Sequence, residues 1–264
     1  MTKTSRAHHK FNKRFIIRHE NYDIYSVNAL AVRDATRSDE EFGNFATYEQ
    51  FPRLIPKGQI WIADKSIEKE GLFYIANVLA RMKEQDKGKP EDQAYTAGLN
   101  VERLLREKLL GLKFRAGRPH KRIPSQLYIE HYLTLPDAEF PIDVWLVDGN
   151  LVRTWYKTDY VEGGHGYVYR WCPKDEIWIE EDVARGEIPF LISHEYLELR
   201  LMRDKKLEYD KAHEICSRVE FKLRLNQGIK RFLAPGRRKL TKADLRKLTS
   251  DEVFEYVVKH CVRK

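Results

Sequence analysis

Hydrophobic positions in the last third of the chain recur with the spacing of two amphipathic helices. In residues 189–203, and again in 209–225, apolar side chains return every three or four positions. That spacing places them on one face of an α-helix, which a globular protein turns toward its core. Pro189 suits the first turn of a helix, where its missing N–H has no partner to lose. The pattern predicts a helical hairpin.

Before this hairpin, the pattern changes to short runs of aromatic and β-branched residues, which favour strands. Such runs lie at 141–156, 166–171 and 176–181. In the first run, Asp148-Gly149 interrupts the apolar residues, and this dipeptide is typical of a two-residue hairpin turn. We therefore expect a small antiparallel sheet followed by the helical hairpin, which is an α+β arrangement.

The chain repeats part of itself. PKGQIWI at 56–62 and PKDEIWI at 173–179 agree at five of seven positions. Two further collinear matches, with offsets of 118 and 120 residues, join 92–106 to 210–224 and Val32-Arg33 to Val152-Arg153. The repeat is too long for a solenoid of short units. It predicts two tandem copies of one α+β unit with pseudo-twofold symmetry.

These matches divide the chain of 264 residues into five parts. The expected parts are a basic N-terminal tail (1–22), a degenerate first copy (23–112), a basic connector (113–139), a second copy (140–227) and a basic helical tail (228–264).

The two helices of the second copy carry titratable residues on faces that should be apolar. His194 and Glu198 are one turn apart on the first helix, with Glu195 beside them at the rim. On the second helix, His213 and Glu220 lie two turns apart on the stripe that should face the core. Because a buried, unpaired carboxylate is costly, these groups need a partner. A divalent cation suits imidazoles and carboxylates, and a hydrogen-bonded His/Glu network is the alternative.

The first copy lacks most of these residues as a group. At an offset of 118 residues, the counterparts of His194, Glu195, Glu198 and His213 are Ala76, Asn77, Ala80 and Tyr95. Glu102 alone matches Glu220. If the His/Glu groups only held the fold together, the first copy should need them too. Their joint absence favours a functional unit in the second copy.

The His-Glu-x-x-Glu sequence of the first helix resembles the HExxH helix of zinc metallopeptidases. In that family both histidines bind zinc, and the glutamate between them is the general base. The resemblance implies that His194 is a ligand and Glu195 the catalytic base, with Glu198 in place of the second histidine. This replacement makes manganese and iron candidates beside zinc. His213 and Glu220 would complete the metal site.

His165 lies among three glycines in VEGGHGYVY, just before a predicted strand. A glycine-rich loop can bring a side chain close to a ligand, so His165 is a further candidate for the metal site. The simpler interpretation is an exposed histidine in an ordinary hairpin loop.

A wider pattern covers residues 150–225 and consists of GGH, EIWI, HExxE, AH and a later Glu. It is similar to that of uncharacterised proteins of phages and bacteria. The similarity implies an intracellular or viral setting and no particular activity.

The charge distribution favours an alternative function, the binding of nucleic acid. The formal net charge is +8, and residues 222–264 alone carry thirteen Lys and Arg against four acidic residues. A basic periphery is typical of proteins that contact a polyanion. Basic residues of the connector and the C-terminal tail are therefore candidates for binding nucleic acid: Arg115, Arg118, Lys121, Arg122, Arg237, Arg238 and Lys239.

Two hypotheses follow. The first is a divalent-metal-dependent hydrolase, using Zn, Mn or Fe, with its site on the hairpin of the second copy. The second is a non-enzymatic nucleic-acid-binding or virion-associated protein whose His/Glu cluster is structural. No apolar run approaches the roughly 20 residues that cross a bilayer, and the N-terminus has no secretory signal. We therefore expect a cytoplasmic protein, or a virion protein if a phage encodes it.

Overall fold

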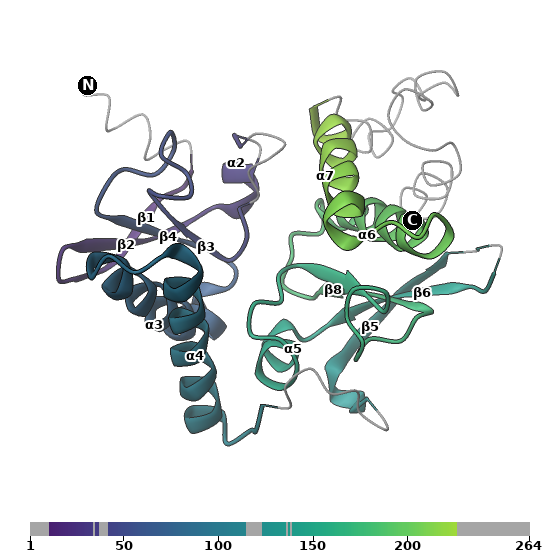
Figure 1. Cartoon of the computed structure of the whole chain (residues 1–264), viewed down its shortest axis with the longest axis horizontal. Coiled ribbons are helices and arrows are strands. Elements are labelled where there is room, and N and C mark those ends of the chain that lie inside the picture. Colours follow the sequence, from purple (N-terminus) through teal and green to yellow (C-terminus); the bar gives the residue numbers. More distant parts are fainter. Residues whose placement is uncertain are drawn as a thin grey trace. The chain divides into compact units, whose positions relative to one another are not determined.

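The computed structural model describes residues 11–33, 35–36, 42–114, 123–135, 137 and 139–225. These residues form two compact units (Figure 1). The first unit contains the described residues up to 114 together with 150–161, and the second contains the remainder. The seven candidate nucleic-acid residues lie outside the described residues: Arg115, Arg118, Lys121, Arg122, Arg237, Arg238 and Lys239.

In the first unit, a four-stranded sheet is followed by two long helices. In chain order the elements are β1 (Arg14–His19), β2 (Tyr22–Val27), α2 (Ala29–Arg33), β3 (Phe45–Thr47), β4 (Gln59–Ala63), α3 (Ile67–Asp86) and α4 (Glu91–Leu110). The strand order is β1-β2-β4-β3, with β2 parallel to β4 and the other pairs antiparallel. Ile24, Ile60 and Ile62 of the sheet pack against Tyr74 and Val78 of α3.

The second unit has the same plan. Its elements are η1 (Ser125–Leu127), β5 (Tyr128–Leu135), β6 (Ile142–Val147), β7 (Gly163–His165), β8 (Glu176–Glu180), α6 (Ile188–Asp204) and α7 (Tyr209–Leu225). The strand order is β5-β6-β8-β7, with β6 parallel to β8. Helix α5 (Gly149–Trp155) follows β6 in the chain, but residues 150–161 belong to the first unit.

Residues at corresponding positions of the two sequence repeats make similar contacts. Trp61 in β4 and Trp178 in β8 each pair with an aromatic residue on the parallel strand. Each indole N–H also donates to the side chain two positions earlier in its own strand. Arg33 of α2 and Arg153 of α5 each donate to a backbone carbonyl further along the chain. The structure is thus α+β, with two sheet-plus-helix units.

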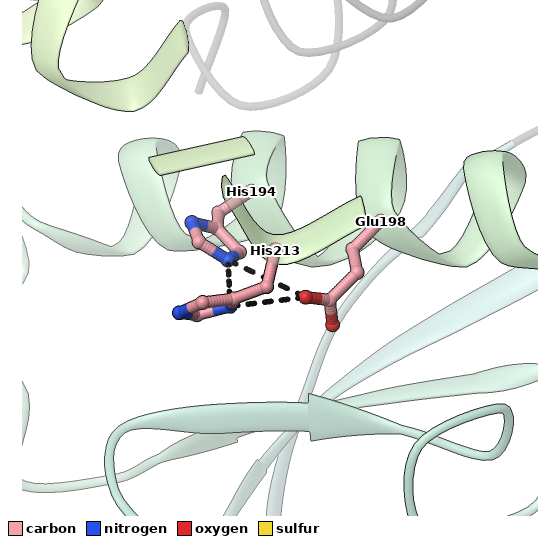
Figure 2. A group of neighbouring side chains, drawn as sticks. All are labelled: His194, Glu198 and His213. Atoms are coloured by element: carbon pink, nitrogen blue, oxygen red, sulfur yellow. Dashed lines mark hydrogen bonds and ion pairs between the residues drawn. The ribbon is translucent and has the colours of Figure 1, made fainter. Parts of the chain in front are cut away.

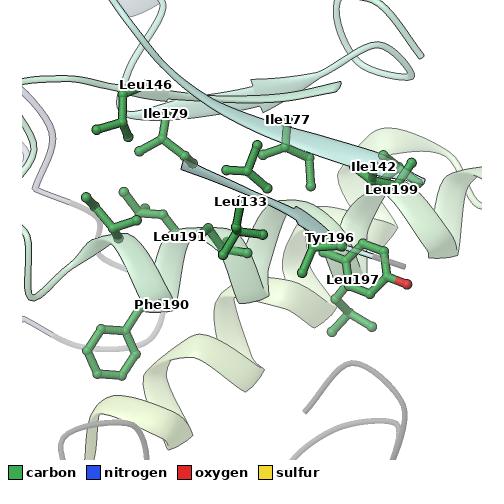
Figure 3. Close-up of a cluster of buried hydrophobic side chains, with 14 of the residues drawn as sticks. Leu133, Ile142, Leu146, Ile177, Ile179, Phe190, Leu191, Tyr196, Leu197 and Leu199 are labelled. Atoms are coloured by element: carbon green, nitrogen blue, oxygen red, sulfur yellow. The ribbon is translucent and has the colours of Figure 1, made fainter. Parts of the chain in front are cut away.

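The core of the second unit lies between its sheet and α6 (Figure 3). Alternate residues of β6, namely Ile142, Val144 and Leu146, point to one face of the sheet, as the two-residue period of a strand requires. Ile177 and Ile179 of β8 extend this face. Each such side chain stabilises the fold by about 1.5–3 kcal/mol when it is fully buried. This apolar layer fixes α6 on the sheet and so sets the position of its polar residues.

The helical hairpin is confirmed. α6 spans Ile188–Asp204, close to the expected 189–203, and α7 spans Tyr209–Leu225 as expected. None of the described helices has the length and apolar character needed to cross a lipid bilayer.

The expectation of antiparallel sheets is wrong, because each sheet contains one parallel pair. The Asp148-Gly149 turn is also wrong: Gly149 begins α5 and is not among the glycines with positive φ that such a turn requires. Residues 166–171 form turns rather than a strand. Strands β1 and β5 lie in segments that were expected to be a tail and a connector.

Candidate metal centre

Histidine side chains from α6 and α7 meet inside the second unit (Figure 2). His194 Nε2 and His213 Nδ1 are 3.2 Å apart, and the two ring centroids are 4.9 Å apart. Because a short connection joins the two helices, their inward stripes pack together and bring the two rings into contact, with their planes tilted by 58°. The two imidazoles therefore meet as the helical pattern predicts.

Glu198 completes a triangle with the two imidazoles. Its Oε2 lies 3.0 Å from His213 Nδ1 and 3.8 Å from His194 Nε2. Glu198 is one turn from His194 on α6, so both side chains project from the same face. A point equidistant from these three atoms lies about 2.0 Å from each, and bonds from zinc to nitrogen or carboxylate oxygen are about 2.0–2.2 Å long. The three residues can therefore hold one metal ion.

Glu220 lies behind His194 rather than beside these three atoms. Its Oε2 is 2.9 Å from His194 Nδ1, the ring nitrogen that does not face His213. A carboxylate at Nδ1 holds the proton of a neutral imidazole there and leaves the Nε2 lone pair for a cation. The sequence predicts Glu220 as a ligand, whereas the structure places its carboxylate against His194 Nδ1, apart from the other three atoms.

His165 is completely buried at the end of β7, so the expectation of an exposed loop histidine is wrong. Its Nε2 lies 3.2 Å from Glu198 Oε1, the carboxylate oxygen that does not face the other two histidines. Burial lowers the pKa of His165, although the hydrogen bond to Glu198 acts in the opposite direction. The ring is therefore neutral at pH 7. Only the glycines around it in the sequence indicated that it could reach the site.

Glu195 lies on the side of α6 that faces β7, not at the rim of the hairpin. An added Cβ at Gly163 of β7 would be 2.9 Å from Glu195 Oε1, and the side chain is 9% exposed. Burial and the negative charge of Glu198 raise the pKa of Glu195 to about 8. Without a cation nearby, Glu195 therefore holds a proton at neutral pH. With His165 and Glu198 it forms a second group of atoms that are close enough to share a cation.

Hydrogen bonds determine the charges of the other buried groups. Burial favours a higher pKa for Glu198, but hydrogen bonds from His165 and His213, together with the nearby His194 imidazole, hold it well below its usual range. Burial favours a lower pKa for His194, but the nearby carboxylate of Glu198 and the hydrogen bond to Glu220 raise its pKa well above the usual value. In the metal-free cluster, a proton on His194 thus supplies the positive charge, and metal binding would displace it.

The cluster reaches solvent beside His213. The His213 side chain is 34% exposed, whereas those of His194 and Glu198 are 6% and 3% exposed. Tyr209, one turn earlier on α7, stacks on the His213 ring at a centroid distance of 5.2 Å and is itself exposed. Of the three side chains, His213 is therefore the one that solvent reaches.

The equivalent helices of the first unit contain a different buried cluster. Arg106 of α4 donates to both Glu70 and Glu102, at 2.6 Å in the latter case. Arg153 donates to Glu70 at 2.9 Å, and Asn77 donates to Glu102 at 2.6 Å. All five side chains are almost fully buried. Two guanidiniums balance two carboxylates, so this cluster is neutral without any bound ion.

Comparisons with models of known protein families, with curated proteins and with solved structures each found no match. The geometry and chemistry of the residues themselves therefore carry any functional assignment.

Proposed function

We propose that the α6/α7 hairpin binds one divalent cation through His194, Glu198 and His213, and that the protein is a metal-dependent hydrolase. The observation that carries the proposal is the triangle formed by His194 Nε2, His213 Nδ1 and Glu198 Oε2, with sides of 3.2, 3.0 and 3.8 Å. Two imidazoles and one carboxylate suit zinc, and they also suit manganese or iron(II).

The surroundings of the triangle support a catalytic rather than a closed structural site. Structural zinc sites use four protein ligands, whereas catalytic sites use three and leave one position open. Three ligand residues lie around this point, and His213 gives it an exposed edge. Glu220 at His194 Nδ1 corresponds to the carboxylate–histidine pairs that orient metal ligands in enzymes.

A bound divalent cation would act as a Lewis acid and lower the pKa of a coordinated water toward neutrality. Within the chain, His194 and His213 would bind as neutral imidazoles and Glu198 as a carboxylate. Glu195 is the candidate proton acceptor, because a nearby positive charge favours the ionised form of a carboxyl group. Its burial against Gly163 keeps it close to Glu198 on the inner side of the site.

The two units support an origin by duplication of one segment. They share strand order, pairing register and the repeated PK-x-x-IWI sequence. In this interpretation the first copy is degenerate at the site, because Ala76, Ala80 and Tyr95 replace His194, Glu198 and His213. The first copy would then have a supporting role.

Elemental analysis of protein purified without a His-tag tests the metal site. Wild-type protein should contain one equivalent of a divalent metal per chain, and His213→Ala should contain almost none. Tyr95→Ala is the matched control, because Tyr95 is the counterpart of His213 on α4 and should leave the metal content unchanged. Wild-type protein that stays metal-free after incubation with zinc, manganese and iron(II) would contradict the proposal.

Turnover of peptide, ester and phosphodiester substrates by metal-loaded protein tests the hydrolase assignment. Glu195→Gln should keep the metal and lower turnover by about 100-fold or more, since general base catalysis contributes about 10²–10⁴-fold. Full activity of Glu195→Gln would exclude Glu195 as the base, and a metal-loaded wild type inactive on all three substrate classes would count against a hydrolase.

A further inference from the structure

The glycines around His165 allow β7 to run unusually close to its neighbours. An added Cβ at Gly163 would meet Glu195 Oε1 at 2.9 Å, and one at Gly166 would meet the carbonyl oxygen of Pro173 at 2.4 Å. At Gly166 the obstacle is backbone, so a side chain has no room there, whereas a side chain at Gly163 would displace the Glu195 carboxyl group. The Gly-Gly-His-Gly sequence therefore places the His165 ring directly against Glu198 of α6.

The hydrogen bonds of His165 determine which ring nitrogen carries its proton. The backbone N–H of Tyr167 donates to His165 Nδ1 at 3.2 Å, so Nδ1 presents a lone pair. A neutral imidazole has one donor and one acceptor nitrogen, and the proton must then lie on Nε2. The Nε2–H group donates to Glu198 Oε1 at 3.2 Å. Both ring nitrogens are thus engaged, and Nε2 has no lone pair for a cation.

This bond holds Glu198 by one of its two oxygens. Oε1 accepts from His165, and Oε2 faces His194 and His213. The terminal torsion of a glutamate is soft, so the orientation of its carboxylate depends on such partners. A buried carboxylate oxygen that loses its donor also bears the full cost of desolvation.

We propose that His165 is a positioning residue, which holds Glu198 Oε2 toward the cation without binding the cation itself. This inference rests on the metal site proposed above and specifies it further. His165, Glu195 and Glu198 also form a second group of candidate ligand atoms. Because the His165 proton lies on Nε2, His165 cannot bind a second cation. The site therefore holds one cation, and Glu198 does not bridge two. The Gly-Gly-His sequence becomes part of the metal site through this role.

Titration of metal-free, full-length protein with cobalt(II) and zinc(II) tests the role of His165. His165→Gln can donate from an amide nitrogen close to the position of Nε2, whereas His165→Leu fills the space without a donor. Wild-type protein should bind one equivalent. His165→Gln should bind within about threefold of wild type, and His165→Leu about 10–100-fold more weakly, which is the usual effect of losing a group that orients a ligand. The visible spectrum of bound cobalt(II) should also change in His165→Leu, because Glu198 is no longer held.

Thr47→Val supplies the matched control. Thr47 ends β3 as His165 ends β7, and it is also buried, so its replacement should leave cobalt(II) affinity and spectrum unchanged. Thermal melts of the metal-free variants report folding separately. If His165→Leu does not fold, His165→Asn replaces it, because asparagine keeps a buried amide that is too short to reach Glu198.

The outcomes separate this inference from the proposed function. Wild-type affinity and spectrum in a folded variant without the donor would overturn the positioning role and leave the metal site intact. If wild-type protein binds two equivalents of cobalt(II), and both His165→Gln and His165→Leu bind only one, then His165 binds a second cation. This result would overturn the positioning role. A wild type that binds no cation would overturn the proposed function itself.

Discussion

The two helical hairpins bury carboxylates in similar places but neutralise them in different ways. At the α3/α4 hairpin, Arg106 bonds to both Glu70 and Glu102, and Arg153 of α5 bonds to Glu70. At the α6/α7 hairpin, Glu198 is surrounded by His194 and His213 of the hairpin and by His165 of β7. A guanidinium is charged at every accessible pH, whereas an imidazole can be a neutral ligand or a cation. The carboxylates of the first hairpin are thus neutralised by permanent charges, from its own Arg106 and from Arg153 of α5, whereas the second hairpin needs a proton or a metal ion.

One inward-facing glutamate occurs at the same position in both hairpins, which indicates that this part of the His/Glu cluster serves the fold. Glu102 and Glu220 occupy matching positions on α4 and α7, and each bonds to a residue on the preceding helix, Asn77 or His194. An inward-facing glutamate is therefore common to both hairpins. His194, Glu198 and His213 are what the second hairpin has in addition, and we attribute the metal site to them.

The largest expected effect is the loss of a ligand. His194→Ala should weaken zinc binding by far more than the 10–100-fold effect that is typical of groups outside the coordination sphere. Competition titration with a chromophoric chelator measures this affinity. Ala76→Gly, at the matching position of α3, should have no effect on binding. Equal metal affinity in His194→Ala and wild type would contradict the assignment of the metal site to the second hairpin.

Replacing Arg106, a buried positive charge of the first hairpin, should strongly lower stability and leave metal binding unchanged. Arg106→Met leaves Glu70 and Glu102 buried with one guanidinium fewer, and breaking such a pair costs about 3–5 kcal/mol. Amide hydrogen exchange in α3 and α4 would report this loss. Arg103→Met breaks a partly exposed ion pair with Glu107 on the same helix and should cost less than about 1 kcal/mol. An equal, small effect of both changes would refute the assigned role of Arg106.

The matching glutamates should respond differently to the same change. Glu220→Gln should weaken zinc binding by about 10–100-fold, because the amide holds His194 Nδ1–H less firmly than a carboxylate does. Glu102→Gln should leave zinc affinity unchanged and reduce protection from hydrogen exchange in α4. A drop in zinc affinity in Glu102→Gln alone would reverse the assignment of the two sites.

The smallest expected effect is the pH dependence of the first hairpin. Burial favours a higher pKa for Glu70, but Arg153 and Arg106 lower it below its usual value. A carboxyl group whose pKa is lower in the folded state adds stability above its unfolded pKa of about 4.3, and this stability disappears as the pH falls through the folded value. Acid unfolding of α3 and α4 below about pH 4 should therefore be less steep in Glu70→Gln. An acid-unfolding slope in Glu70→Gln equal to that of wild type would contradict this role of Glu70.

The helical hairpin and the meeting of its histidines could be predicted, because helical periodicity is local and a short connection forces two stripes together. The role of Glu220 could not be predicted, because helical spacing gives the face of a residue but not the ring nitrogen that it contacts. The contact of His165 with Glu198 was even harder to predict. A three-residue strand of Gly-Gly-His has no propensity pattern, and its burial depends on how closely β7 approaches α6.

The strand pairing could not be predicted either. Short apolar runs indicate strands, but the parallel pairing of β6 with β8 depends on where the chain travels between them. That intervening chain includes residues 150–161, which belong to the first unit. Arg153 therefore bonds to Glu70, which is 83 residues away in the sequence, and no local pattern indicates this contact.

The most direct test of the difference between the hairpins is anomalous diffraction from crystals of the full-length protein grown with zinc or manganese. One strong peak per chain should lie within about 2.0–2.3 Å of His194 Nε2, His213 Nδ1 and Glu198 Oε2, with His165 Nε2 outside bonding distance. No peak should lie between α3 and α4. A map without a peak in the α6/α7 hairpin, or with equal peaks in both hairpins, would contradict the account.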